Sequence, residues 1–224
     1  MKNIGVILAG NGFLDGAEIR EAVLTLLSID QQGAKATIFA PDFDQFHTIN
    51  HLTNEEMKEK RNVLIESARI ARGQIHPLED INIDELDGLI IPGGFGVAKN
   101  LSTIAFDGAK AKVDKTFQQI MVSAFERKIP IGAICISPAV ICLILKEASP
   151  SLTIGDDEAT AGLINSLGGN HIQSEVTDVH VDEKNKIVST PAYMFGDARL
   201  SKVATGIDKC VKEVIALINQ GSGS

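Results

Sequence analysis

The amino-acid sequence predicts a single α/β domain, built as a three-layer sandwich around a mostly parallel central sheet. Short continuous apolar runs alternate along the chain with longer segments in which apolar residues recur at helical spacing. Such runs are typical of strands that are buried on both faces, as the strands of parallel sheets are. A chain of 224 residues with 44% hydrophobic content can bury one full core of this kind.

The first elements form a βαβ unit, whose crossover is expected to be right-handed. Residues 4–9 are apolar and end at Gly10-Asn11-Gly12, which predicts a strand and a glycine-rich loop at its carboxyl end. A helix is expected over residues 17–32, followed by a second strand over residues 34–40.

A polar and mixed stretch at about residues 44–77 interrupts the alternation and contains a helix-like piece at residues 55–72. We interpret the stretch as an insertion over the carboxyl ends of the strands, because long insertions in compact α/β domains are usually lids or interface elements.

The rest of the chain returns to the α/β pattern. A strand at residues 86–91 runs into Pro92-Gly93-Gly94-Phe95-Gly96, and an amphipathic helix at residues 113–127 follows. Further elements are predicted as strands at 129–134, 151–154, 171–176, 179–181 and 187–189, helices at 158–167 and 199–219, and a hairpin tip at 183–186. We expect one domain over residues 1–220 and interpret residues 221–224 as a flexible tail or cloning remnant.

One segment brings a cysteine to the point where a strand turns into a helix. Residues 129–134 form a buried strand, Ser137 is a suitable N-cap and Pro138 suits the first helical position. Cys135 would then lie between a strand and the N-terminus of a helix, as in a nucleophile elbow. Unpaired helix N–H groups favour a thiolate, so we expect a lowered pKa and a nucleophilic role for Cys135. Cys142 and Cys210 are expected to be core thiols, the commoner fate of cysteine.

A nucleophilic cysteine requires a proton acceptor, and no histidine lies within thirty residues of Cys135 on either side. A histidine from a distant segment remains possible. Glu18 and Glu21 lie one turn apart at the start of the first helix, on the same rim of the sheet as Cys135. Each could simply complement the helix dipole, or act as a general acid/base if burial raises its pKa.

Backbone groups offer a candidate oxyanion site. The N–H groups of Gly93, Gly94 and Ile136 could face an oxyanion formed when Cys135 attacks a carbonyl, although glycines are also common in simple turns. The glycine clusters lack the spacings of nucleotide-binding loops, and the histidines and acids lack metal-ligand spacing. We therefore expect neither a cofactor nor a metal.

Composition narrows the expected partners. The net charge is −8 and the 21 basic residues are scattered, which argues against nucleic acid and anionic membranes and favours a small-molecule or protein partner. The three cysteines are odd in number and show no CxxC spacing, and the first residues lack a signal peptide pattern. From these features we expect a cytoplasmic protein.

Several motifs resemble those of the ThiJ/PfpI superfamily, which has the flavodoxin-like, class I glutamine amidotransferase-like fold, and within it those of the ElbB (enhancing lycopene biosynthesis) family. The resemblance covers residues 2–219 and is carried by residues 15–22, 49–53, 61–66, 92–96, 135–139, 181–183 and 190–194. It implies a Cys135–Glu21 catalytic pair, because Glu21 lies twelve residues before Gly33, with Glu18 as a neighbouring acid.

The resemblance also implies a function, that of a glutathione-independent, glyoxalase III-type lyase that converts glyoxal or methylglyoxal to glycolate or lactate. Cys135 would form a hemithioacetal with this 2-oxoaldehyde and Glu21 would transfer a proton between its two carbons. Two alternatives stay open: a redox-sensing or regulatory protein linked to isoprenoid metabolism, and an amidase-like hydrolase. Ile136 stands where many superfamily hydrolases carry histidine, which disfavours the latter. Members commonly dimerise, which leaves a homodimer open, but the sequence does not define the oligomeric state.

Overall fold

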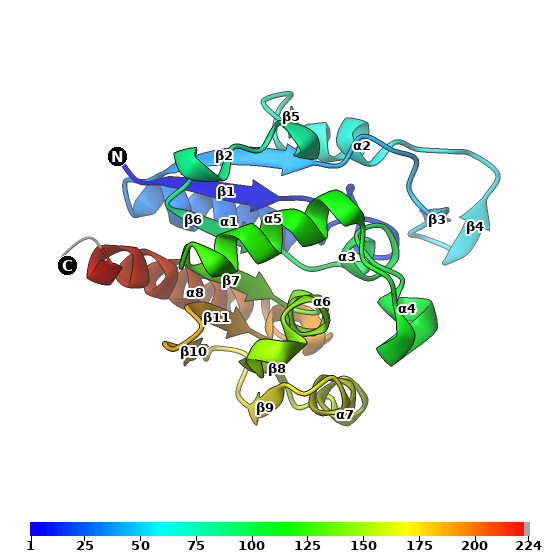
Figure 1. The fold of residues 1–224 in the computed structure, drawn as a ribbon. Coiled ribbons are helices and arrows are strands. Elements are labelled where there is room, and N and C mark those ends of the chain that lie inside the picture. The colour runs from blue at the N-terminus through cyan, green and yellow to red at the C-terminus, as the bar shows by residue number, and fades with distance from the viewer. Residues whose placement is uncertain (222–224) are drawn as a thin grey trace.

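A mostly parallel sheet divides the molecule into two layers of helices (Figure 1). In the computed structural model, which describes residues 1–221, seven strands pair in the order β10-β11-β7-β6-β1-β2-β5. All neighbours are parallel except β10 and β11. The strands are β1 (Asn3–Ile7), β2 (Lys35–Ala40), β5 (His76–Pro77), β6 (Gly88–Ile91), β7 (Ile131–Ile134), β10 (His180–Asp182) and β11 (Ile187–Thr190). The predicted α/β fold with a mostly parallel sheet is confirmed.

The two faces of the sheet support separate hydrophobic cores, because successive side chains of a strand point to opposite faces. Within β6, Leu89 and Ile91 belong to one core and Ile90 to the other. The first core packs under α3 (Phe95–Lys99), α4 (Ile104–Asp107), α5 (Lys115–Glu126), α6 (Ser137–Ile144) and α7 (Glu158–Ser166). The second packs under α1 (Ile19–Gln31), α2 (Val63–Ile70) and α8 (Leu200–Gly221). All four residues of β6 are buried, as the continuous apolar run predicts.

Residues 44–77 divide into a projecting hairpin and a part that belongs to the fold. The hairpin consists of β3 (Thr48–Asn50) and β4 (Glu55–Met57) and extends beyond the sheet beside α4 (Figure 1). In contrast, α2 packs against α1 and β2, and β5 adds an edge strand. The helix-like piece begins only at Val63, because Asn62 accepts a hydrogen bond from the Ile65 N–H and caps the helix there.

A short pair of parallel strands extends the structure next to β11. These are β8 (Ser151–Gly155) and β9 (Asn170–Gln173), joined by α7. The Thr153 N–H donates to the Ser189 hydroxyl of β11 at 2.9 Å, which ties this pair to the main sheet.

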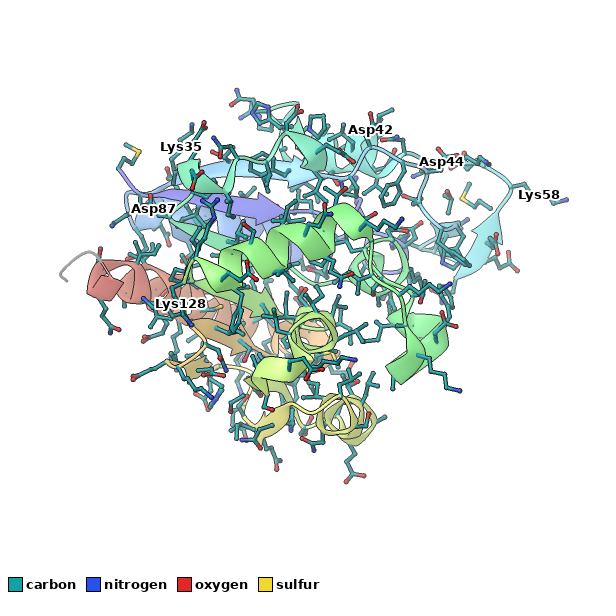
Figure 2. All side chains as sticks on the ribbon, viewed as in Figure 1. Lys35, Asp42, Asp44, Lys58, Asp87 and Lys128 are labelled. Atoms are coloured by element: carbon teal, nitrogen blue, oxygen red, sulfur yellow. The ribbon has the colours of Figure 1, made fainter. Side chains whose placement is uncertain are left out.

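The surface of the molecule carries charged side chains of both signs. Positively charged lysines and negatively charged aspartates, such as Lys35, Asp42 and Lys128, lie around the outline of the molecule (Figure 2). Within the described part of the chain, no helix combines the length and the apolar character that a membrane span requires. Helix α8 includes Gly221, and the rest of the predicted tail, residues 222–224, lies outside the described residues.

Candidate active site

Cys135 lies in the turn between β7 and α6 in a backbone conformation that few residues other than glycine adopt. Its φ is +62°, in the left-handed region, which costs about 1–2 kcal/mol for an ordinary residue. The turn is held by the Cys135 N–H, which donates to the Thr190 carbonyl at the end of β11 at 2.9 Å. This strained turn presents the thiol at the carboxyl ends of the central strands, the usual ligand site of open α/β sheets.

The predicted cap at Ser137 is wrong. Ser137 is the first residue of α6, and its hydroxyl donates to the Pro92 carbonyl at 3.1 Å instead of accepting from the helix. The hydroxyl points to the Pro92 carbonyl, just after the end of β6, and not to the N–H groups at the start of α6. Ser137 therefore fastens the Cys135 turn to the loop after β6.

Glu21 lies beside Cys135 and is completely buried. The two side chains lie close together, because a Cβ added to Gly93 would lie 2.7 Å from Glu21 Oε2 and 3.0 Å from Cys135 Sγ, and each affects the pKa of the other. The backbone also orients the carboxyl: Gly93 N–H donates to Oε2 at 2.9 Å, and Tyr193 N–H donates to Oε1 at 3.1 Å. Both carboxyl oxygens are thus fixed by segments far from Glu21 in the sequence, and the structure brings together the pair that the resemblance implied.

The close packing of Cys135 and Glu21 around position 93 requires a residue without a side chain, which Gly93 provides. A Cβ added there would lie 2.4 Å from the Cys135 Cβ and 2.7 Å from Glu21 Oε2. Its N–H is already bound to Glu21, so the expectation that it faces a substrate oxyanion is wrong for this arrangement. The N–H groups of Gly94 and Ile136 instead act to lower the pKa of the Cys135 thiol. These two donors remain suitable for negative charge that develops next to the sulfur.

The environment raises the pKa of both members of the pair. Burial raises the pKa of Glu21 to about 8, against the opposing hydrogen bonds from Tyr193 and Gly93. Burial, followed by the charge of Glu21, raises the pKa of the Cys135 thiol, and the Gly94 and Ile136 N–H groups offset only part of this. The expectation of a lowered thiol pKa is therefore wrong, because Cys135 is only 8% exposed and a carboxyl lies against it.

Glu18 has a different position from Glu21. It caps α1, with its Oε2 accepting a hydrogen bond from the Glu21 N–H at 2.6 Å. Its own N–H donates to the Gly93 carbonyl at 2.9 Å. Glu18 is partly exposed, and burial raises the pKa of its carboxyl. It therefore contacts the pair through the backbone of Glu21 and supplies an acidic group between the pair and solvent.

Histidine takes no part in this arrangement. Within residues 1–221 none of the five histidines hydrogen-bonds to Cys135 or Glu21; His171, for example, lies against the Ile154 N–H at 3.4 Å. In the same part of the chain, no three histidine, cysteine or acidic side chains converge as metal ligands. The groups available for chemistry at the elbow are one thiol, one buried carboxyl and the surrounding N–H donors.

Tyr193 and Thr190 are functional positions that the sequence analysis did not assign. Their backbone groups hold Glu21 and Cys135 respectively, and they follow β11, the strand next to β7. The predicted strand at residues 187–189 was the signal that could have identified them, because the carboxyl ends of adjacent parallel strands meet at one edge of a sheet.

A pocket of about 420 Å³ lies among residues that contact Glu21, although its lining includes neither Glu21 nor Cys135. Glu18 and Tyr193, which both contact Glu21, line the pocket together with Arg20, Phe13 and His51. The Arg20 guanidinium donates to the Tyr193 hydroxyl at 3.0 Å. The pocket therefore connects solvent to the residues that surround the dyad.

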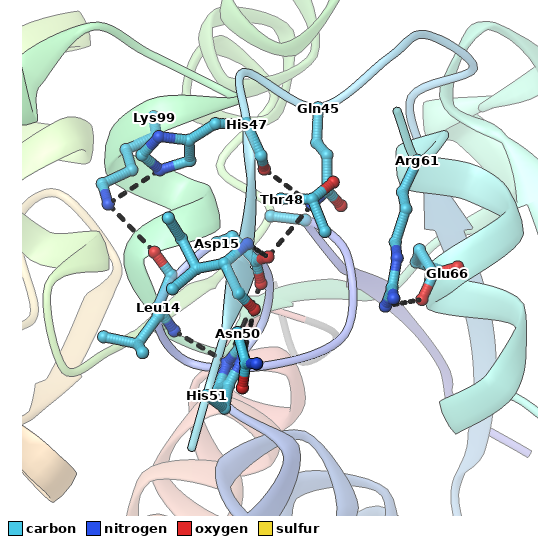
Figure 3. A network of polar contacts seen from close by, with 12 residues as sticks. Leu14, Asp15, Gln45, His47, Thr48, Asn50, His51, Arg61, Glu66 and Lys99 are labelled. Atoms are coloured by element: carbon cyan, nitrogen blue, oxygen red, sulfur yellow. Dashed lines mark hydrogen bonds and ion pairs between the residues drawn. The ribbon is translucent and has the colours of Figure 1, made fainter. Parts of the chain in front are cut away.

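A polar network fixes the hairpin against the loop that follows β1 (Figure 3). The buried Asp15 carboxylate accepts hydrogen bonds from the Ile49 N–H at 2.6 Å and from the Gln45 amide at 3.2 Å. His51 accepts from the Leu14 N–H at 3.2 Å through Nε2. Its Nδ1 lies 3.0 Å from the Ile49 carbonyl. The network places His51 as a wall of the pocket.

A second group of contacts holds the base of the hairpin. The Arg61 carbonyl accepts from the Gln45 N–H at 2.8 Å, and the Arg61 guanidinium lies 3.7 Å from the buried Glu66 carboxylate (Figure 3). On the other side, Lys99 Nζ donates to the Leu14 carbonyl at 2.9 Å. The motifs at residues 49–53 and 61–66 are thus used to hold one side of the pocket.

Comparison with known proteins gives relatives over nearly the whole chain. The rat mitochondrial ES1 protein homolog is 41% identical over 96% of the chain and 83% of its own length. The human mitochondrial glutamine amidotransferase-like class 1 domain-containing protein 3 is 40% identical over 96% of the chain and 82% of its own length. No family model matches the chain.

Solved structures extend the comparison. An isoprenoid biosynthesis protein with an amidotransferase-like domain from Ehrlichia chaffeensis is 40% identical, has a TM-score of 0.91, and is matched over 97% of this chain and 99% of its own. A glyoxalase III from Candida albicans has a TM-score of 0.60 at 13% identity, over 96% and 97% of the two chains, and shares the fold.

The comparison corrects the expected location. The rat and human relatives are both named as mitochondrial proteins, which contradicts the cytoplasmic assignment. That assignment depended on the first residues and on cysteine usage, and unpaired cysteines indicate a reducing environment without distinguishing one compartment from another.

Proposed function

The chain belongs to the ES1 family of glutamine amidotransferase-like class 1 proteins, and on this premise we propose that it is a cofactor-independent glyoxalase. It would convert methylglyoxal to lactate and glyoxal to glycolate. The observation that carries the proposal is the close approach of the Cys135 thiol and the buried Glu21 carboxyl, which affect each other's pKa. A nucleophile and a neighbouring acid/base are the two groups that this internal redox reaction requires.

The first step forms a hemithioacetal. The reactive form of the pair carries one proton, with Cys135 as thiolate and Glu21 as carboxylic acid. The sulfur forms a bond to the aldehyde carbon of methylglyoxal, the carbonyl electron pair moves to oxygen, and Glu21 protonates that oxygen. The N–H groups of Gly94 and Ile136, which act to lower the thiol pKa, would stabilise charge at this centre.

The second step moves hydrogen between the two carbons. The Glu21 carboxylate removes the proton from the former aldehyde carbon, the ketone oxygen takes up a proton from water, and an enediol forms. Glu21 returns its proton to the second carbon while the hydroxyl on the first loses its proton to water. The first carbon is oxidised to a thioester and the second is reduced to an alcohol, so no external oxidant is consumed.

Hydrolysis completes the cycle. Water adds to the thioester carbon, Glu21 accepts a proton from that water, and the carbon–sulfur bond breaks to release the Cys135 thiolate and the acid product. Glu18, which lies between Glu21 and the pocket, is placed to exchange protons with solvent.

The proposal also includes a family type and a metabolic connection for the chain. Within the family we assign the chain to the ElbB type, and its connection to isoprenoid metabolism depends on the name of the Ehrlichia chaffeensis protein. The histidine-dependent hydrolase alternative has little support, because no histidine within residues 1–221 hydrogen-bonds to Cys135.

The test is lactate formation from methylglyoxal by purified protein. Wild type should produce lactate without glutathione, Cys135→Ala should produce none, and Glu21→Gln should lose about 10²- to 10⁴-fold in kcat. Cys142→Ala, which removes a buried thiol outside the site, is the matched control and should retain activity if it folds by circular dichroism. Wild-type lactate formation no faster than that of Cys135→Ala would refute the proposal.

A further inference from the structure

One face of α1 exposes a row of apolar side chains. Ile19, Val23 and Leu27 follow one another at four-residue spacing, which places them on the same side of the helix. Phe13 lines a pocket together with Ile19, and all four side chains are between 45% and 48% exposed. Single exposed apolar residues are common on protein surfaces, whereas a row of them is typical of a surface that another protein covers.

The opposite face of α1 is used inside the molecule. Ala22, Thr25 and Ile29 are buried there, and the helix packs against α8, α2 and β2. A helix whose outer side only faces water usually carries polar residues on that side. In contrast, α1 has apolar residues on both sides, and residues 1–221 cover only one of them.

The exposed face of α1 carries charges of opposite sign at its two ends. Arg20 lies at the start of the apolar row and Asp30 lies beyond its end, and both are exposed. At 3.6 residues per turn they lie on the same side of the helix as the row, about 15 Å apart along its axis. If two copies of α1 pair antiparallel about a two-fold axis level with Thr25, Arg20 lies level with Asp30 of the second copy. The same symmetry places Val23 level with Leu27 of the second copy.

The order of the charges selects among possible partners. Parallel pairing of two α1 helices would bring Arg20 against Arg20 and Asp30 against Asp30. A helix that binds an anionic membrane surface is usually rich in lysine and arginine, whereas Arg20 is the single basic residue of α1. The face therefore fits a second copy of this chain in antiparallel orientation best.

Arg20 is held on the surface with donors to spare. Its guanidinium donates to the Tyr193 hydroxyl at 3.0 Å and lies 5.7 Å from the centroid of the Tyr193 ring. Glu18 also attracts it electrostatically. The hydrogen bond to Tyr193 uses one of its five N–H donors, so others can meet a carboxylate of a second copy. Because Arg20 also lines the pocket, Asp30 of that copy would lie at the edge of the pocket.

We propose that this chain forms a two-fold symmetric homodimer through α1, with the two helices antiparallel and the apolar rows packed against each other. Arg20 of each copy pairs with Asp30 of the other. The inference is independent of the proposed chemistry, because it uses the outer face of α1 and neither Cys135 nor Glu21.

Sedimentation equilibrium over a micromolar concentration series measures the mass and the dimer dissociation constant. Wild type should have twice the mass of the 224-residue chain. Val23→Glu should raise the dissociation constant at least about 100-fold, because it buries a charge in the apolar contact of both copies. Ile65→Glu is the matched control, since Ile65 is an apolar residue of α2 that is 63% exposed outside the row, and it should leave the dimer unchanged. Circular dichroism checks that both variants fold.

Two charge substitutions test the orientation of the helices. Arg20→Glu and Asp30→Lys should each weaken the dimer about tenfold, because each places like charges together at two symmetry-related contacts. The double variant exchanges the two signs and should recover to within about threefold of the wild-type dissociation constant.

The outcomes distinguish this inference from the proposed function. A wild-type protein that stays monomeric throughout the series would overturn the dimer, and so would a dimer that Val23→Glu leaves intact. Additive weakening in the double charge variant, without recovery, would overturn the antiparallel pairing. Lactate formation by a monomeric wild type would support the glyoxalase without the dimer, and a dimer without lactate formation would support the interface without the glyoxalase.

Discussion

Replacing Glu21 by glutamine should change the pH dependence of folding in a way that few single substitutions would. Glu21 is completely buried, and its pKa is raised from an ordinary value of 4.5 to about 8, chiefly by burial. Between these two pH values the unfolded chain releases a proton that the folded protein keeps. Wild-type stability should therefore fall with rising pH in this window, and the loss is complete above about pH 8.

The size of the effect follows from the width of the window. One pKa unit corresponds to about 1.36 kcal/mol. Titration of Glu21 should therefore lower the wild-type free energy of unfolding by about 4 kcal/mol between pH 5 and pH 8. Glutamine does not titrate and avoids this loss. Its NH₂ group must face one of the two N–H donors, from Gly93 or Tyr193, and this costs about 1–3 kcal/mol at every pH. The variant should thus be less stable than wild type at pH 5 and more stable at pH 8.

Urea denaturation of both proteins at pH 5, 6.5 and 8 measures this difference. Titratable groups remote from Glu21 contribute equally to both proteins and cancel in the comparison. Glu126→Gln, an exposed substitution on α5, serves as the control and should differ little from wild type throughout. A difference between Glu21→Gln and wild type that stays constant within about 1 kcal/mol from pH 5 to 8 would refute the raised pKa and with it the buried acid of the mechanism.

Three further predictions concern the same pair. The kcat/KM for methylglyoxal should rise with pH through about 8, because the pair must lose one proton to form the thiolate, and a flat profile from pH 6 to 9 would contradict this. Iodoacetamide should label Cys135 slowly at pH 7 and faster in Glu21→Gln, since the substitution removes the carboxyl that helps to raise the thiol pKa; mass spectrometry of the labelled peptide measures both rates, and equal rates would be inconsistent with the contact. Gly93→Ala should lose at least about 100-fold in kcat and about 1–3 kcal/mol of stability by urea denaturation, because the new Cβ would lie 2.4 Å from the Cys135 Cβ; normal activity would show that the contact is not tight.

Local patterns determined much of the fold. The short apolar runs correctly predict the buried strands, and Cys135 was placed at a strand-to-helix turn because residues 129–139 alone specify such a turn. The edge strand at His76–Pro77 was missed, since a two-residue strand leaves no periodic pattern. The predicted helix-like piece wrongly includes β4, the second strand of the hairpin, because its residues Glu55–Met57 have no apolar face that distinguishes a strand from a helix.

The sequence by itself determined the fold class, the turn at Cys135 and the choice of Glu18 and Glu21 as candidate acids. The family resemblance favoured Glu21, and only the tertiary structure supplied the physical distinction, because it buries Glu21 near the thiol and leaves Glu18 at the pocket. It also decided that the thiol pKa is raised and that the Gly93 N–H binds a carboxyl. The physical reason is that a turn depends on residues a few positions apart, whereas burial and the pKa depend on segments that meet only in the folded protein.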